Sequence, residues 1–177
     1  MSLKELTADK HAEAEATPFM KAVFAGKMTP RIWVDWTYQK YAFYKEIEDK
    51  ADMCGLLEDL PGIKRADLLM QDYENMAFKD HTLALTETAY NYCAYIRSLN
   101  DPSRIMAHLY TWHMGDMFGG QMIKKIIPAS HLNLEFEDVA TLKTNIRAKL
   151  EDSMSEEANI AFDWAIRMMR DYDSSLG

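Results

Sequence analysis

Three glycines inside an otherwise helical segment constrain this chain more than any other feature. The segment 103–128, SRIMAHLYTWHMGDMFGGQMIKKIIP, has apolar residues three and four apart and ends at a proline, as a helix does. Its middle holds Gly115, Gly119 and Gly120, and each glycine costs a helix interior about 1 kcal/mol relative to alanine. We therefore expect a helix in which the missing side chains serve a purpose.

Two interpretations of this glycine cluster remain open on spacing alone. Gly115 and Gly119 are four residues apart, so they share one face of the predicted helix, and Asp116 lies beside them. In the first interpretation the helix bends there, or a flat ligand approaches its bare backbone with a carboxylate at the edge of the gap. In the second, another helix packs closely on the small residues.

Composition limits the class of protein. The 177 residues predict one domain over 1–177, with 48% hydrophobic and 27% charged residues. The net charge of −8 argues against nonspecific binding of nucleic acid. Cys54 and Cys93 lie far apart and in no metal-binding spacing, which indicates a reducing compartment. Without a long apolar run or a signal-peptide pattern, we expect a cytoplasmic protein that does not enter membranes.

Helical periodicity extends over the whole chain, without alternating strand patterns or internal repeats. The predicted fold class is therefore all-α. In the helix that follows Pro30, the residues Trp33, Trp36, Tyr44 and Ile47 have helical spacing and are expected to face the core. Helix starts are predicted from capping residues, several of them followed by proline: Ser2, Thr17-Pro18, Thr29-Pro30, Asp101-Pro102 and Ser155. A further helical pattern starts at Thr86.

Two pairs of titratable residues have the spacing of one helical turn. His11 and Glu15 share a face, so the carboxylate is placed to hold the imidazole ring, as a metal-binding histidine requires. On local sequence alone, a surface pair without a metal is the better interpretation. Lys143 and Arg147 are like charges at the same spacing, which is unfavourable unless an anion or water lies between them.

Several enzyme classes lack their motifs in this chain. No Glu-x-x-His or Asp-x-x-His occurs, so a carboxylate-bridged di-iron bundle has no ligand set. The phosphate-binding loop, the dinucleotide-binding glycine motif, the nucleophile elbow and the Cys-x-x-Cys motif are also absent. His108 and His113 are five residues apart and do not share a helical face, so they cannot bind one metal together.

The stretch YTWHMGDMFGGQ, residues 110–121, resembles the distal-helix motif of the heme oxygenases, where Tyr and Thr lead into Gly-Asp and then Gly-Gly-Gln. The first helix agrees, because HAEAE at 11–15 followed by Phe19 is similar to the family's proximal segment. The basic pair at 143–147 also matches, so the resemblance covers nearly the whole chain. It implies a single all-α domain with heme between the first helix and the glycine-bent helix.

The resemblance also implies an activity. Heme b would be both cofactor and substrate, and O2 would open its ring to biliverdin, with the IXα isomer expected, CO and ferrous iron. Electrons would come from reduced ferredoxin or a similar donor, and a downstream bilin reductase is a candidate partner. A carrier or sensor that binds heme without degrading it is the alternative, and an all-α interaction module without a cofactor is the third hypothesis.

The matching positions carry the family's roles by resemblance. The implied proximal ligand of the heme iron is His11, oriented by Glu15. Catalytic roles are implied for Asp116, which would anchor proton-delivering water, and for Gly115, Gly119 and Tyr44. Contacts to heme and its propionates are implied for Lys4, Tyr110, Lys143, Arg147, Gly120 and Phe118. Three residues depart from the family's common pattern: Trp112 and His113 replace Arg and Tyr, and Phe118 replaces Ser.

Overall fold

The computed structural model describes residues 1–176, and these residues form helices and connecting segments with no strand. The helices are α1 (Leu3–Leu6), α2 (Ala8–Glu15), α3 (Pro18–Phe24), α4 (Pro30–Met53), α5 (Ala66–Met76), α6 (Glu87–Ser98), α7 (Pro102–Leu109), α8 (Gly115–Met117), α9 (Gly119–Ile126), α10 (Val139–Ala148), α11 (Ser155–Arg170) and α12 (Asp173–Leu176). A π-helical segment, η1 (Tyr110–Met114), joins α7 to α8, and the short 3-10 helices are η2 (Leu132–Leu134) and η3 (Asp152–Met154). The predicted all-α class is confirmed.

Capping side chains explain where several of the helices begin. At five of the predicted starts the capping oxygen accepts a backbone N–H inside the first turn: Ser2 from Glu5, Thr17 from Met20, Thr29 from Ile32, Thr86 from Ala89 and Asp101 from Ser103. The prediction for Ser155 is wrong. There η3 runs directly into α11, Ser155 is already helical, and Met154 occupies the capping position without a side-chain hydrogen bond.

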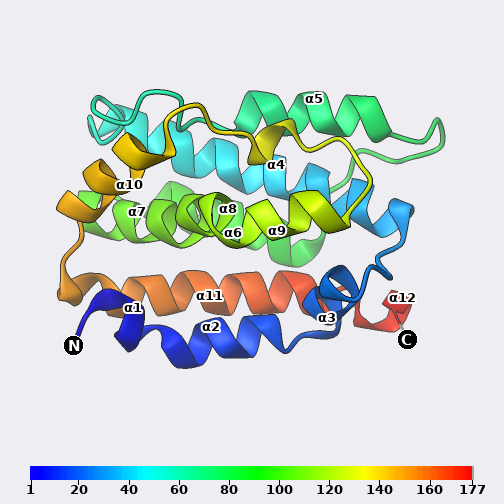
Figure 1. Ribbon diagram of the computed structural model, residues 1–177, viewed down its shortest axis with the longest axis horizontal. Coiled ribbons are helices and arrows are strands. Elements are labelled where there is room, and N and C mark those ends of the chain that lie inside the picture. Colours follow the sequence, from blue (N-terminus) through cyan, green and yellow to red (C-terminus); the bar gives the residue numbers. More distant parts are fainter. Residues whose placement is uncertain (177) are drawn as a thin grey trace.

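The helices stack in layers, as Figure 1 shows. In that view α4 and α5 lie at the top, α6 to α9 cross the middle, and α11 lies below them with α1 to α3. Helix α4 packs on α5, α6 and α7, whereas α11 packs on α2, α6, α7 and η1. The two long helices α4 and α11 therefore enclose the glycine-containing chain from opposite sides and fix its position.

Aromatic side chains of α4 form much of the core. Trp36, Phe43, Tyr44 and Ile47 are buried, and Trp33 is half-buried against them, which confirms the predicted core face. The ring of Phe43 lies 4.5 Å from that of Trp112 on η1, measured between centroids. Each such side chain contributes on the order of 1.5–3 kcal/mol by burial, so α4 anchors η1 firmly.

The glycine-containing segment is not a regular α-helix. It passes from α7 through the wide π-helical turn η1 into α8, and it breaks again at Phe118, whose φ is −107° and ψ −81°. These two irregularities are recognised causes of a bent helix. The two irregularities agree with the first interpretation of the glycine cluster, and they lie immediately before and after Gly115–Met117.

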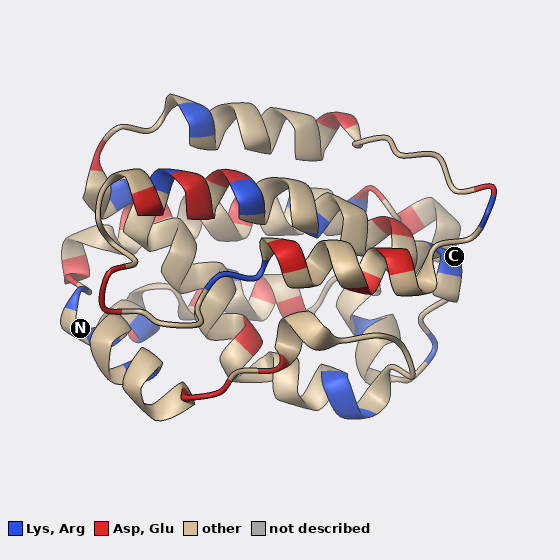
Figure 2. Cartoon of the chain, turned by 90° about the horizontal axis from the view of Figure 1, so that it is seen from above, with Lys and Arg blue, Asp and Glu red and all other residues tan. Residues whose placement is uncertain are grey.

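Charges of both signs are spread over the helices, with blue and red segments interspersed along the same ribbons in Figure 2. Exposed ion pairs such as Lys45–Asp49, 3.1 Å apart on α4, join some of them, and each contributes at most about 1 kcal/mol. Within residues 1–176, no helix is both long enough and apolar enough to cross a membrane.

Candidate functional site

The three glycines of the bent segment have different surroundings. A Cβ atom added to Gly115 or Gly119 would meet no atom within 4 Å, so the backbone there faces open space. A Cβ on Gly120 would come within 2.9 Å of Leu134 Cδ2. The structure thus assigns close packing to Gly120, while Gly115 and Gly119 have the surroundings expected where a flat ligand approaches.

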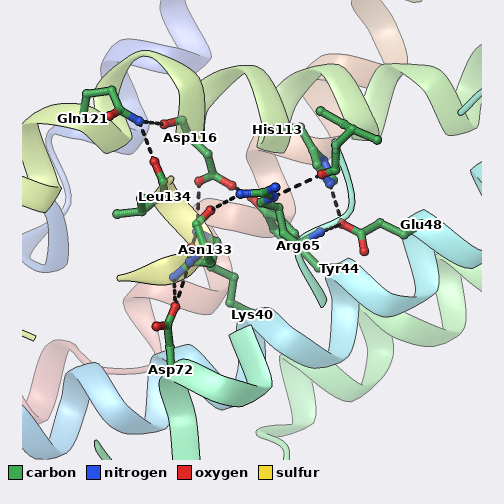
Figure 3. Close-up of polar contacts among 11 residues, drawn as sticks. Lys40, Tyr44, Glu48, Arg65, Asp72, His113, Asp116, Gln121, Asn133 and Leu134 are labelled. Carbon is green, nitrogen blue, oxygen red and sulfur yellow. Dashed lines mark hydrogen bonds and ion pairs between the residues drawn. The ribbon is translucent and has the colours of Figure 1, made fainter. Parts of the chain in front are cut away.

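Asp116 lies beside these glycines with only 7% of its surface exposed. Its two carboxylate oxygens accept hydrogen bonds from α4: Oδ2 from the Tyr44 hydroxyl at 2.6 Å, and Oδ1 from Lys40 Nζ at 2.9 Å (Figure 3). Burial raises the pKa of Tyr44 well above its usual value, and the charge of Asp116 raises it further. Tyr44 therefore stays protonated and acts as a donor. The resemblance implied a catalytic role for Tyr44, and the structure places its hydroxyl on the Asp116 carboxylate.

Lys40 also donates to the side-chain oxygen of Asn133, at 3.1 Å. Asn133 is in turn held by Asp72, which accepts its backbone N–H at 2.9 Å and its side-chain N–H at 2.6 Å. Figure 3 shows these groups converging from α4, α5 and the η2 segment on Asp116. Sequence analysis missed Lys40, Asn133 and Asp72, because no local motif joins residues that are 76 and 93 positions apart.

His113, one of the departures from the family pattern, points into the protein behind Tyr44. Its Nε2 lies 2.8 Å from Glu48 Oε2, and its ring stacks on Tyr44 with centroids 4.6 Å apart. Glu48 also accepts the backbone N–H groups of Arg65 and Ala66. His113 is fully buried, so it supports Tyr44 and does not border the open face at Gly115.

His11 lies on α2 with 60% of its side chain exposed. Its Nε2 is 3.2 Å from Glu15 Oε1, so the predicted one-turn pair is formed, and the ring meets Phe162 edge-on with centroids 5.8 Å apart. With one ring nitrogen facing Glu15, the other is the one available to a metal. No proximal metal is needed to hold the ring in this position, because Glu15 and Phe162 already do so.

The structure brings most of the predicted propionate-binding residues together. Lys143 on α10 places its Nζ 3.7 Å from the ring centroid of Phe118, at the break in the glycine segment. Burial raises the pKa of Tyr110, and the positive charge of Arg147 partly offsets that shift. Lys4 lies on α1 with an exposed side chain.

These features fit heme on grounds of chemistry. Bare backbone at Gly115 and Gly119 suits the face of a flat ligand, and an accessible imidazole suits its iron. Cations on α10 suit carboxylates at its edge. The buried carboxylate of Asp116 adds an acceptor for ordered water, because two protein donors fill only half of the roughly four hydrogen bonds a carboxylate accepts.

Comparisons with known proteins agree with this chemistry. The family model described as Heme oxygenase matches residues 1–148. "Heme oxygenase 2" of Oryctolagus cuniculus is 26% identical over 207 residues, covering 98% of this chain and 65% of the rabbit protein. "Heme oxygenase" of Porphyra purpurea is 26% identical over 208 residues, covering 98% and 86% respectively. The chain thus spans about two thirds of the length of the mammalian relative.

Solved structures show the same fold. Heme oxygenase-1 from the cyanobacterium Synechocystis sp. PCC6803, solved in complex with heme, superposes with a TM-score of 0.86 at 22% identity, over 98% of this chain and 91% of that one. The heme oxygenase from Leptospira interrogans gives a TM-score of 0.85 at 22% identity, over 97% and 100%. With a family model that matches most of its length, this chain belongs to the heme oxygenase family.

Proposed function

We propose that the chain is a heme oxygenase that opens heme to biliverdin, with IXα as the expected isomer, CO and ferrous iron. The observation that carries this proposal is the open backbone at Gly115 and Gly119 beside the Asp116 carboxylate. A protein that only carries heme has use for the open backbone, but it gains nothing from a carboxylate clamped between two donors next to it. Family membership and the heme-bound relative support the same conclusion.

His11 would bind the heme iron, and Glu15 would orient the ring. The propionates would be held by Lys143, Arg147, Tyr110 and Lys4, so that one edge of the ring is presented. When bound, heme supplies the iron that activates O2 and the carbon framework that is oxidised. Phe118 would contact the ring from the break in the glycine segment, and Gly120 would contribute by letting the segment pack on Leu134.

Asp116 would control protons at the open face. Its carboxylate has acceptor positions left for water after binding Tyr44 and Lys40. Water held there is oriented by a group that cannot turn, since both oxygens are already fixed. Gly115 and Gly119 keep side chains out of the space where O2 and this water must lie. Tyr44, kept protonated by burial, donates to Asp116 throughout.

Electrons would come from reduced ferredoxin, an acidic protein, docking on exposed lysines. The candidate docking lysines are Lys4, Lys10, Lys124 and Lys125. Lys10 is paired with Asp163 at 2.7 Å, and Lys124 lies 3.9 Å from Glu135, so Lys4 and Lys125 are expected to contribute most. Turnover with ferredoxin should slow as salt rises, because exposed charges are screened within about 8 Å at physiological ionic strength. Rates independent of salt would contradict electrostatic docking.

The function is tested by adding hemin and following the Soret band, then adding reductant with ferredoxin and following biliverdin absorption. His11→Ala should alter the Soret band, and added imidazole should restore it. His131→Ala is the matched control, because His131 also lies near a glutamate four residues on, Glu135 at 3.8 Å. A Soret band without biliverdin would favour the heme carrier or sensor, and unchanged spectra in His11→Ala would refute its role as iron ligand.

A further inference from the structure

Lys40 is a buried cation that no motif of the sequence predicts. Only 12% of its side chain is exposed, and its Nζ lies 2.9 Å from Asp116 Oδ1 and 3.1 Å from Asn133 Oδ1. It also lies 5.0 Å from the centroid of the Tyr44 ring. Burying an ammonium group is unfavourable unless partners surround it, so this arrangement needs a reason beyond packing.

Lys40 and Tyr44 are one turn apart on α4, which places their donor groups side by side. Each donates to a different oxygen of Asp116. A carboxylate held at one oxygen can still turn about the bond to its Cβ, whereas a carboxylate held at both oxygens cannot. The two residues of α4 together therefore fix the direction in which the remaining acceptor positions of Asp116 point.

The far side of Lys40 is fixed as well. Asp72 accepts from Ser130, Leu132 and Asn133, at distances of 2.6 to 2.9 Å, and is fully buried. Arg65 donates to the backbone carbonyl of Glu135 at 2.6 Å. These bonds hold the segment around η2 against α5, and Asn133 presents its side-chain oxygen to Lys40 from that rigid support.

We propose that Lys40 is a positioning residue: it fixes the Asp116 carboxylate toward the open face at Gly115, and the reaction depends on it although it does not touch the substrate. This inference rests on the proposed heme oxygenase function. Its chemistry is the restraint of one carboxylate by an opposite charge, which is anchored in turn through Asn133 to Asp72.

The test compares Lys40→Met, Lys40→Arg and the control Lys45→Met, which removes an exposed ion pair with Asp49 on the same helix. Lys40→Met should bind heme within about threefold of the wild-type Kd. Its kcat for biliverdin formation should fall at least about tenfold, which corresponds to a loss of about 1.4 kcal/mol of transition-state stabilisation. Peroxide-driven oxidation of guaiacol should rise relative to ring opening. Lys40→Arg should recover a substantial part of kcat, and Lys45→Met should match the wild type.

Two further measurements keep the proposal falsifiable. If Lys40→Met does not fold, Lys40→Gln keeps an amide NH2 donor group without the charge, and a wild-type kcat in that variant would overturn the proposed restraint by an opposite charge. A crystal structure of a heme-free Lys40 variant should show the Asp116 carboxylate turned or spread over several orientations. An unmoved carboxylate would overturn the positioning role. Absence of biliverdin from the wild-type protein would instead refute the proposed function and leave this structural result to stand alone.

Discussion

Replacing Gly115 by alanine should stabilise the heme-free protein while it damages function. Gly115 has helical torsion angles, φ −57° and ψ −42°, and an added Cβ meets no atom within 4 Å. Alanine therefore fits without a steric clash. Its higher helix propensity and the lower entropy of its unfolded state should together raise the free energy of unfolding by about 0.5–1 kcal/mol. For a chain of this length that corresponds to a rise in Tm of roughly 1–4 °C.

The same methyl group would stand in the space assigned to heme and its distal ligand. Overpacking a fitted space costs about 1–3 kcal/mol, so heme affinity or biliverdin formation should fall about 5- to 150-fold. Urea and thermal unfolding of the heme-free protein measure the first effect, and hemin titration with a turnover assay measures the second.

Gly120→Ala is the matched control for Gly115→Ala, because its Cβ would come within 2.9 Å of Leu134 Cδ2 and Leu134 would have to move. Gly120→Ala should therefore gain less stability than Gly115→Ala, or lose some. If Gly115→Ala proved destabilising, or more stable with full activity, the assignment of its open face to a ligand would be wrong.

Two other predictions concern buried charges. Lys40→Met and Asp116→Asn should each lower the free energy of unfolding by about 3 kcal/mol, because each leaves the opposite charge buried without its partner. The double variant should lose at least about 2 kcal/mol less than the sum of the two single losses. Additive losses in urea unfolding would contradict a coupled pair. Burial opposes ionisation of Glu157, but hydrogen bonds from His108 and Tyr95 outweigh it and lower its pKa from 4.5 to about 2. The contribution of ionised Glu157 to the free energy of unfolding is therefore complete above pH 4.5 and disappears as the pH falls toward 2. We expect this contribution to be roughly 1–2 kcal/mol, because solvent screens the interaction with the half-exposed Arg104. Glu157→Gln should flatten the stability–pH curve in that window, and an unchanged slope would show that the carboxylate does not carry it.

Local chemistry explains what the sequence could predict. Thr29 before Pro30, and Asp101 before Pro102, act within one turn, so these helix starts follow from neighbouring residues alone. The glycines likewise indicated an irregular helix, since glycine weakens a helix interior, but the positions of the π-helical turn and of the break at Phe118 did not follow from them. The start at Ser155 was mispredicted because the preceding turn, η3, already fixes the backbone there.

The rest of the site depends on contacts between distant residues. Nothing near Lys40 in the sequence distinguishes it from an exposed lysine such as Lys45, five residues further along the same helix. Its role follows from the packing of α4 against α8 and η2, which sequence periodicity does not specify. His113 is similar: its ring faces Glu48 only because the turn around it is wider than an α-helical turn.

The wide turn Tyr110–Met114 sets the direction in which the residues after it face. Each residue of an α-helix advances about 100° around its axis, so a regular turn would present the residues after η1 at a different angle to those before it. If the same five residues adopted the α-helical repeat, Asp116 would rotate away from Lys40 and Tyr44, and Gly115 would turn from the open face. The π-helical geometry of this turn is thus as strict a requirement as the identity of the carboxylate itself.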